Sequence, residues 1–299
     1  MADVDLRKLR YFVAVAEQLH FGRAAEQLYI AQPVLSRQIR ALEDELSVQL
    51  FVRDRRSTAL TPAGEQLLAD ARPLLAGAQA LRRRVLRAAR RADTFTVGFM
   101  PGLIVTPPVR AMADRHPDLT LELVRTTWDD QTTAIHDGRV DVSFVRFPID
   151  AQGLSVRPLH TEPRVVVVSA DHRLAGKKTV DVADLADEHL LQVPDLVPEW
   201  RGVATELRIG RADVPVFHSV EEKLEHVAAG RGIVILPLSV MTFYTRPDIA
   251  YLTVRDIAPN QVSLAWGADR HSLLIEEFAD LAAALGPPVT REALGARDR

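Results

Sequence analysis

A chain of 299 residues, 47% hydrophobic and without cysteine, is long enough for about two globular domains and excludes disulfide frameworks, thiolate metal sites and thiol redox switches. Its net charge of −3 divides into sixteen Lys and Arg against ten Asp and Glu in residues 1–92, and twenty-one against thirty in residues 93–299. This asymmetry favours a basic module that binds a polyanion, joined to an acidic domain, although charge alone equally allows chance clustering on solvated faces.

Three short helices are predicted at the N-terminus. Apolar residues recur at helical spacing from Leu6 to Ala16, with Asp3 or Asp5 as the cap, and Gly22–Leu28 fits a second helix. After a tight connection, Pro33 suits the first position of a third helix. The apolar stripe of this third helix consists of Leu35, Ile39, Leu42 and Leu46. The second and third of these helices, joined by the tight connection, predict a helix-turn-helix.

The third helix carries polar and basic residues opposite its stripe. At 100° per residue, Pro33, Arg37 and Arg40 lie opposite the apolar residues, and Ser36 flanks them. A helix that enters the major groove reads bases with its N-terminal residues, where this face offers hydroxyl and guanidinium groups. Two strands, Phe51–Arg53 and Ala59–Thr61, then predict a wing whose arginines suit phosphate or minor-groove contact: Arg53, Arg55 and Arg56.

The first module resembles a known family. The segment Phe21–Asp54, FGRAAEQLYIAQPVLSRQIRALEDELSVQLFVRD, is similar to the winged helix-turn-helix of LysR-type transcriptional regulators, and IAQPVLSRQIRALE is similar to the branch that controls aromatic-compound catabolism. The resemblance implies contacts to double-stranded operator DNA from the helix and the wing, by Gln32, Pro33, Ser36, Arg37 and Arg53. Arg40 and Arg55 join this set by their positions. The alternative to DNA binding is a winged helix that contacts other proteins.

A long helix is predicted next, with Thr61 as its cap and Pro62 at its first position. Apolar residues repeat at a and d positions over about three heptads, which predicts a two-helix coiled-coil seam: Leu67, Ala71, Leu74, Ala78, Leu81, Val85 and Ala88. The resemblance implies that this helix forms a homodimer and that the assembly is a homotetramer. We assign dimerisation to the larger side chains, Leu67, Leu74, Leu81 and Val85.

From Thr94 onward, strands alternate with helices, which predicts mainly parallel sheets covered on both faces. The predicted strands are Phe95–Phe99, Leu119–Val124, Asp141–Phe144, Arg164–Ser169, Leu190–Val193, Val214–Phe217, Ile233–Leu236, Ala250–Leu252 and Val262–Trp266. The predicted helices are Val105–Arg115, Asp130–His136, Val220–Ala229 and Ser272–Leu285.

Motifs of the same family recur here, in TVGFMPGLIVTPPVRAMADRHPDLTLELV, GRVDVSFVR and VAAGRGIVILP. The resemblance implies an α/β effector domain with two lobes, like a periplasmic binding protein, behind the winged helix-turn-helix and the linker helix. We assign residues 1–60 to the DNA-binding domain, 61–90 to the linker helix and 93–299 to the effector domain. Lobe I then comprises 93–162 and 267–299, lobe II comprises 163–266, and the chain crosses between them near Glu162–Arg164 and Trp266–Gly267.

A small-molecule site in such a domain lies between the lobes, at strand ends and helix N-termini. In the loop Met100–Thr106, Gly102 and Leu103 offer backbone donors, and Gly102 leaves extra room where relatives often have a hydroxyl residue. Trp128 either stacks on a ring or plugs the pocket. Trp200 aligns loosely with a pocket-lining segment of the family.

Arg146 ends a strand and resembles in placement a carboxylate-binding arginine of the aromatic-responsive branch. Its guanidinium fork suits an anionic ligand, while the alternative is a salt bridge between the lobes. Together with Gly102, Trp128 and Trp200, it predicts a site for a small carboxylate, either aromatic or a ring-cleavage product. Ligand binding would bias lobe closure and so the spacing of the DNA-binding heads.

Competing classes of protein lack their signatures in this sequence. Gly230–Gly232 precedes a strand and lacks the third glycine of a dinucleotide turn, and the sequence has no G-x-S-x-G, phosphate-binding loop or H-E-x-x-H. We therefore expect no enzyme, cofactor or metal. An architectural DNA-binding protein without a ligand is the remaining competitor, whereas a regulator should prefer its operator by at least ~10³ over other DNA.

The cellular location is predicted from the N-terminal segment and from the length of the apolar runs. The charged segment Met1–Arg10 has no apolar stretch, and no apolar run approaches the roughly 18 residues that span a bilayer. We expect a cytoplasmic protein without a membrane segment, which argues against an extracellular solute binder. RNA polymerase is a further candidate partner of such a regulator.

Overall fold

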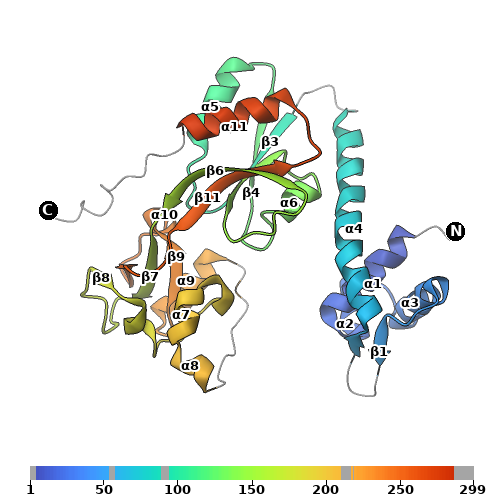
Figure 1. Cartoon of the computed structure of the whole chain (residues 1–299), viewed down its shortest axis with the longest axis horizontal. Helices are drawn as coiled ribbons and strands as arrows, with labels where there is room; N and C mark the ends of the chain where they lie inside the picture. The colour runs from blue at the N-terminus through green and yellow to red at the C-terminus, as the bar shows by residue number, and fades with distance from the viewer. Residues whose placement is uncertain (1–4, 54–57, 89–93, 210–216, 218, 286–299) are drawn as a thin grey trace. The chain divides into compact units, whose positions relative to one another are not determined.

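The computed structural model describes residues 5–53, 58–88, 94–209, 217 and 219–285. The chain forms two compact units: Met1–Arg90 with His136–Arg139, and Arg91–Ile135 with Val140–Arg299 (Figure 1). They are called the N-terminal unit and the C-terminal unit below.

The N-terminal unit combines short helices, a hairpin and one long helix. Its elements are α1 (Leu6–Gln18), α2 (Phe21–Gln27), α3 (Gln32–Leu46), β1 (Phe51–Arg53), β2 (Thr58–Leu60) and α4 (Pro62–Ala88). Asp5 caps α1 by accepting a hydrogen bond from the Arg7 backbone N–H at 2.7 Å. Thr61 Oγ1 accepts from the Gly64 N–H at 3.0 Å and so caps α4, which continues through Pro73.

The core of this unit fixes which way α3 faces. Phe12, Phe21 and Phe51 pack their rings together, with the Phe51 centroid 5.4 Å from that of Phe12 and 5.8 Å from that of Phe21. Leu35 and Ile39 of α3 are fully buried against these rings. Since the apolar stripe of α3 is used in this way, its polar side faces outward.

In the C-terminal unit, lobe I is built on a five-stranded sheet with the order β4-β3-β5-β11-β6. The strands are β3 (Thr94–Phe99), β4 (Thr120–Arg125), β5 (Val142–Arg146), β6 (Leu154–Glu162) and β11 (Asn260–Gly267). β3 runs parallel to β4 and β5, whereas β11 runs antiparallel to β5 and β6. Its helices are α5 (Thr106–Arg115), α6 (Thr133–His136) and α11 (Leu273–Leu285).

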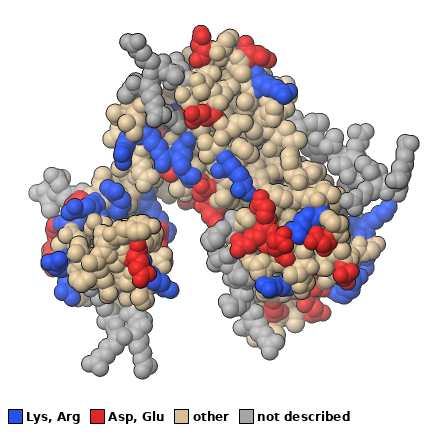
Figure 2. Space-filling model, turned by 180° about the vertical axis from the view of Figure 1, so that it is seen from behind, with Lys and Arg blue, Asp and Glu red and all other residues tan. Residues whose placement is uncertain are grey.

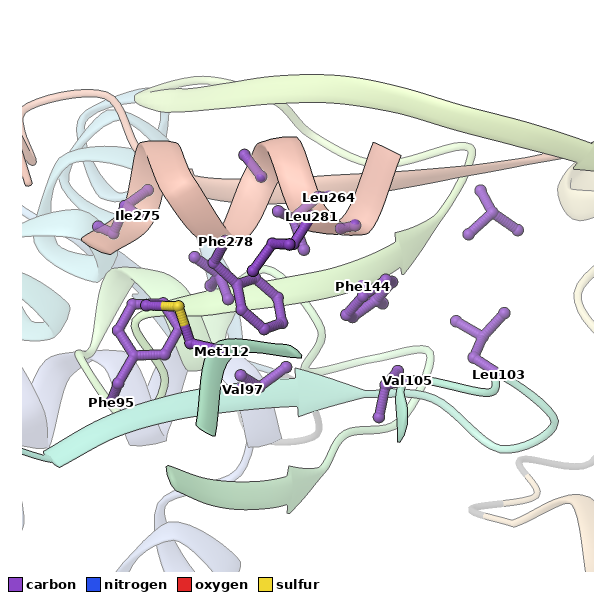
Figure 3. Packing of buried hydrophobic residues seen from close by; sticks show 14 of the residues in the cluster. Phe95, Val97, Leu103, Val105, Met112, Phe144, Leu264, Ile275, Phe278 and Leu281 are labelled. Atoms are coloured by element: carbon purple, nitrogen blue, oxygen red, sulfur yellow. The ribbon is translucent and has the colours of Figure 1, made fainter. Parts of the chain in front are cut away.

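Helix α11 covers the sheet of lobe I beside α5 (Figure 1). Phe278 of α11 points toward the strands in Figure 3, with its ring 5.4 Å from that of Phe95 and 6.2 Å from that of Phe144. Met112 of α5 completes this cluster and is fully buried. Lobe I is therefore a packed layer that can hold the ends of its strands in fixed positions.

Lobe II is built on a four-stranded sheet with the order β8-β10-β7-β9. The strands are β7 (Arg164–Ser169), β8 (Thr179–Val180), β9 (Val234–Pro237) and β10 (Ile249–Val254). β7 is antiparallel to β9 and β10, and β8 is parallel to β10. The helical segments are η1 (Val182–Leu185), η2 (Pro194–Leu196), α7 (Pro198–Val203), α8 (Thr205–Arg208), α9 (Val220–Ala228) and α10 (Leu238–Phe243).

The sheets differ from the sequence prediction in several respects. They are mixed rather than mainly parallel, because β11, β7 and β10 each have antiparallel partners. Strands β6 and β8 are not among the predicted strands, and the predicted strand Leu190–Val193 supplies only an isolated bridge between Leu190 and Ile233. The predicted strand Val214–Phe217 lies outside the described residues except for Phe217. All of β11 belongs to the sheet of lobe I, so the second crossing precedes Asn260 and does not lie at Trp266–Gly267.

Candidate nucleic-acid interface and ligand cavity

The outward face of α3 carries the residues predicted to read DNA. Gln32, Pro33, Arg37 and Arg40 are exposed, and Ser36 is half-buried. Neither Arg37 nor Arg40 makes an ion pair or hydrogen bond with the part of the chain that the structure describes. In Figure 2, basic side chains predominate on the visible face of the N-terminal unit. The face therefore offers two guanidinium groups that no described carboxylate neutralises.

A carboxylate farther along α3 has a structural partner instead. Glu43 Oε1 accepts hydrogen bonds from the backbone N–H groups of Leu50 and Phe51, at 3.0 and 3.2 Å. This contact ties β1, the first strand of the predicted wing, to the C-terminal half of α3. Glu43, which no pattern in the sequence singles out, thus fixes the position of β1 beside α3.

The turn before α3 presents a residue that sequence reasoning missed. Tyr29 is 95% exposed and has a φ of 54°, a left-handed conformation that a non-glycine residue adopts mainly in turns. Its exposure next to the N-terminus of α3 makes it a candidate for phosphate contact.

In the predicted wing, Arg55 lies outside the described residues, and for Arg53 only the backbone, in β1, is described.

The predicted dimerisation residues of α4 differ in their surroundings. Leu67 packs partly against the core of the N-terminal unit. Leu74, Leu81 and Val85 are 51%, 58% and 61% exposed. An apolar row at heptad spacing that no described residue covers is the surface that a second helix would bury.

A cavity of about 230 Å³ lies between the two lobes of the C-terminal unit. Strand ends of lobe I meet the N-terminus of α9 and strands β7 and β9 of lobe II around it. The lining residues are Met100, Pro101, Arg125, Thr127, Trp128, Asp129, Arg146, Phe147 and Asn260 from lobe I, and Arg164, Leu191, Gln192, Val193, Leu196, Phe217, Ser219, Val220, Lys223, Ile235, Leu236, Pro237 and Val240 from lobe II.

Arg146 lines this cavity, but most of its hydrogen-bonding capacity is used by the protein. Its Nε donates to Glu162 Oε1 at 3.0 Å, Nη1 to the Pro101 carbonyl at 2.8 Å and Nη2 to Ser239 Oγ at 2.8 Å. The Ser239 N–H in turn donates to Glu162 Oε2 at 3.2 Å. Burial lowers the pKa of Arg146, and the charge of Glu162 opposes this shift. Because Ser239 belongs to lobe II, these contacts form the interlobe link that was the alternative interpretation.

Gln131 holds the backbone of Arg146 in place. Its amide Oε1 accepts from the Arg146 N–H at 2.8 Å, and its Nε2 donates to the Arg146 carbonyl at 3.2 Å. Gln131 is itself 2% exposed. The end of β5 is therefore pinned by a buried amide before its side chain reaches the other lobe.

Three of the predicted effector residues do not belong to the lining that the structure describes. Trp200 is fully buried in the core of lobe II and donates its indole N–H to the Leu185 carbonyl at 3.0 Å, so its predicted role is corrected. Leu103 packs into the core of lobe I. Gly102 has a φ of +84°, and a Cβ there would lie 2.8 Å from the Cα and N of Val240. The predicted extra room beside Gly102 is thus filled by α10.

Four basic side chains line the cavity, and they differ in what neutralises them. Arg164 Nη2 donates to the Leu196 carbonyl at 3.2 Å, and its Nη1 lies 4.0 Å from Glu199. Arg125 Nη2 lies 3.6 Å from Glu221. Lys223 makes no ion pair or hydrogen bond with any described residue. Burial lowers the pKa of Lys223, and Asp129 provides the largest opposing attraction.

Apolar and polar groups complete the wall. Trp128 packs partly against the core of lobe I, and Phe217 stands on lobe II with its ring 4.4 Å from that of His226. Asn260 Nδ2 donates to the Phe147 carbonyl at 2.8 Å, whereas its buried Oδ1 has no partner among the described residues. The cavity can therefore hold a small molecule with an apolar body and an anionic group.

Two family models together match nearly the whole chain. Residues 6–65 match the bacterial regulatory helix-turn-helix protein model of the lysR family, and residues 88–286 match the LysR substrate binding domain. The chain belongs to the LysR family. It is a DNA-binding transcriptional regulator with an effector-binding domain, and these matches indicate a regulator rather than an enzyme.

Relatives of this LysR-type regulator extend over both units. HcaR of Escherichia coli K12, the Hca operon transcriptional activator, is 35% identical over 270 residues, which cover 88% of this chain and 90% of HcaR. BenM of Acinetobacter baylyi is 33% identical, with 80% and 82% covered. The structure of an H2O2-bound OxyR mutant from Corynebacterium glutamicum is similar with a TM-score of 0.53 and 30% identity, covering 95% of this chain and 92% of that one.

Among the described residues, no helix is long and apolar enough to cross a membrane, and no group of His, Asp and Glu is arranged to hold a metal ion. The helix-turn-helix match contains the whole of α3, and the substrate-binding match contains every residue of the interlobe cavity.

Proposed function

We propose that this LysR-type regulator reads one operator sequence with α3 and that a small carboxylate in the interlobe cavity sets its activity. The charge of the lining supports the second part: Arg125, Arg146, Arg164 and Lys223 face the cavity, against Asp129 alone among the described lining residues. An apolar wall with a few convergent cations suits a ligand with one anionic group.

In the proposed DNA complex, the N-terminal half of α3 enters the major groove. Arg37 contacts base edges, with Gln32, Pro33 and Ser36 beside it, while Arg40 contacts phosphate. Arg53 and Arg55 extend the contact from the wing. Arg37 and Arg40 support this proposal, because neither guanidinium group has an ion pair or hydrogen bond with a described residue that DNA binding would have to break.

The exposed row Leu74, Leu81 and Val85 on α4, with Leu67, supports a homodimer whose two recognition helices read two half-sites. Pairing of dimers through other surfaces would give the homotetramer implied by the family. A regulator of this kind acts in the cytoplasm, where its DNA is, with RNA polymerase as a further partner.

The similar OxyR structure holds peroxide, but the proposed effector of this chain is not a peroxide sensed through a thiol. This chain has no cysteine, so it has no thiol for peroxide to oxidise. Trp128 is placed to contact the apolar body of a carboxylate, and the similarity of the helix-turn-helix to the aromatic-catabolism branch favours an aromatic body.

Selection of duplexes from a random library by the purified chain, followed by fluorescence anisotropy, tests the DNA part. Arg37→Ala should cost about 1–3 kcal/mol on the selected sequence and leave scrambled DNA nearly unaffected, whereas Arg53→Ala should weaken both and flatten the salt dependence. Arg10→Ala, an exposed arginine of α1, is the matched control. Equal affinity of the wild-type chain for selected and scrambled DNA would instead favour the architectural protein.

A further inference from the structure

The basic residues around the interlobe cavity are not equally available to a ligand. Arg146 already makes three hydrogen bonds, to Glu162, Pro101 and Ser239, and its side chain is 2% exposed. Arg164 donates to a carbonyl and faces Glu199, whose Oε1 also accepts from the Ala258 N–H. An incoming carboxylate would have to compete with these partners.

Lys223 is the exception. Its ammonium has no hydrogen-bond or ion-pair partner among the described residues, although the residue is half-buried and burial lowers its pKa. A desolvated ammonium without a partner is costly to bury, and a ligand carboxylate that pairs with it recovers that cost. The negative charges that attract it are those of Asp129, which lines the cavity from lobe I, and Glu222 on its own helix.

The position of Lys223 on α9 adds to its effect. The helix begins at Val220, with Ser219 as the N-cap, so Lys223 lies at the end of the first turn. Ser219, Val220 and Lys223 all line the cavity, which places the positive end of the helix dipole and the ammonium on the same wall. The first turn of α9 also holds Glu221, which faces Arg125 and Tyr244 instead.

We propose that Lys223 is the group that pairs with the effector carboxylate, and that Arg146 is a positioning residue that links the lobes. This inference rests on the proposed function of the cavity as a carboxylate site and identifies its anion-binding wall as the first turn of α9. The ligand then lies with its carboxylate toward lobe II and its apolar body toward Trp128. Asp129 opposes anion binding, which restricts the site to ligands with one carboxylate near this wall.

Calorimetry of the full chain with benzoate, phenylacetate and cinnamate, each compared with its amide, tests the proposal. At least one carboxylate should bind more tightly than its amide. Lys223→Met should weaken that carboxylate about 10- to 100-fold, the effect of losing a charge-assisted hydrogen bond, and leave the amide unchanged. Lys223→Arg should retain binding, and Asp129→Asn should tighten the carboxylate but not the amide. Lys177→Met, an exposed lysine of lobe II, is the matched control.

The outcomes separate this inference from the proposed function. A carboxylate that binds wild type and Lys223→Met equally well overturns the role of Lys223 and leaves a carboxylate site intact. Failure of every carboxylate to exceed its amide in the wild-type chain overturns both. A ligand-free readout is also available: Lys223→Met should shift urea unfolding to higher concentration, and a shift to lower concentration contradicts an unpaired ammonium.

Discussion

Replacement of Arg146 by methionine should destabilise the C-terminal unit far more than loss of a surface charge would. Methionine keeps most of the side-chain volume but leaves Glu162 without the donor to its Oε1, so that only the Ser239 N–H remains, at 3.2 Å from Oε2. Both side chains are buried, at 2% and 8% exposed. Breaking a buried ion pair by removing one partner costs about 3–5 kcal/mol.

Tryptophan fluorescence makes this cost measurable in the full chain. The three tryptophans, Trp128, Trp200 and Trp266, all belong to the C-terminal unit, so their signal reports its unfolding. With a urea slope of about 2.5 kcal/mol per M, the unfolding midpoint should fall by roughly 1–2 M.

Two further variants show whether the buried pair is the cause. Arg157→Ala removes a surface partner of Asp280 and should cost at most about 1 kcal/mol. Arg146→Met combined with Glu162→Gln removes both charges and should be more stable than Arg146→Met alone. A fall below about 1 kcal/mol for Arg146→Met, or no recovery in the double variant, would refute the assignment of Arg146 as an interlobe link.

Three other outcomes are expected. Leu81→Glu places a charge in the exposed apolar row of α4 and should shift sedimentation toward monomer, whereas Gln79→Glu, exposed on the same helix, should not. Gly102→Ser should cost at least about 1 kcal/mol, because the φ of +84° and the backbone of Val240 both oppose a Cβ, while Gly202→Ser, with open space around it, serves as the control. Burial lowers the pKa of His160 below its ordinary 6.5, so its contribution to stability is full above pH 6.5 and is lost as the pH falls from there toward the folded pKa. Urea titrations at pH 7 and pH 5 measure how much the free energy of unfolding falls between the two pH values. This fall should be smaller for His160→Gln than for wild type, with a difference of at most about 1.4 kcal/mol per pH unit. Equal falls in the two proteins would contradict this role of His160.

Local periodicity was sufficient to predict the buried side of α3, because that side is a single apolar stripe along one helix. The α3 stripe at Leu35 and Ile39 alone decides which face is buried, so the outward position of Arg37 follows from the sequence. The sequence does not predict strand β6, because Pro158 lies inside it and proline argues against a strand. In the structure β6 is an edge strand with an irregular register opposite Val262 and Ser263, which is where a strand tolerates proline.

The cavity was harder to predict because its walls come from distant parts of the chain. Trp200 lies in α7, which spans only Pro198–Val203, and so short a helix has too little periodicity to show which side faces the core. The space beside Gly102 is filled by Val240, a contact no local pattern contains. Lys223 shares a helix face with Val220, a spacing visible in the sequence, but only the tertiary structure turns that face toward a cavity.

The charge asymmetry of the chain leads to a final prediction about salt. Residues 93–299 carry twenty-one basic against thirty acidic residues, and Asp and Glu side chains gather on the visible face of lobe II (Figure 2), yet four of the basic residues line the cavity. An anionic effector must therefore approach through a repulsive field before it reaches an attractive site. Added salt screens the long-range repulsion more than the pairing inside the cavity, so stopped-flow tryptophan fluorescence should show carboxylate association accelerating with ionic strength. DNA binding by the basic N-terminal unit should weaken over the same range. Carboxylate association that slows with salt would mean that cations outside the cavity steer the ligand, contrary to the charge distribution of this unit.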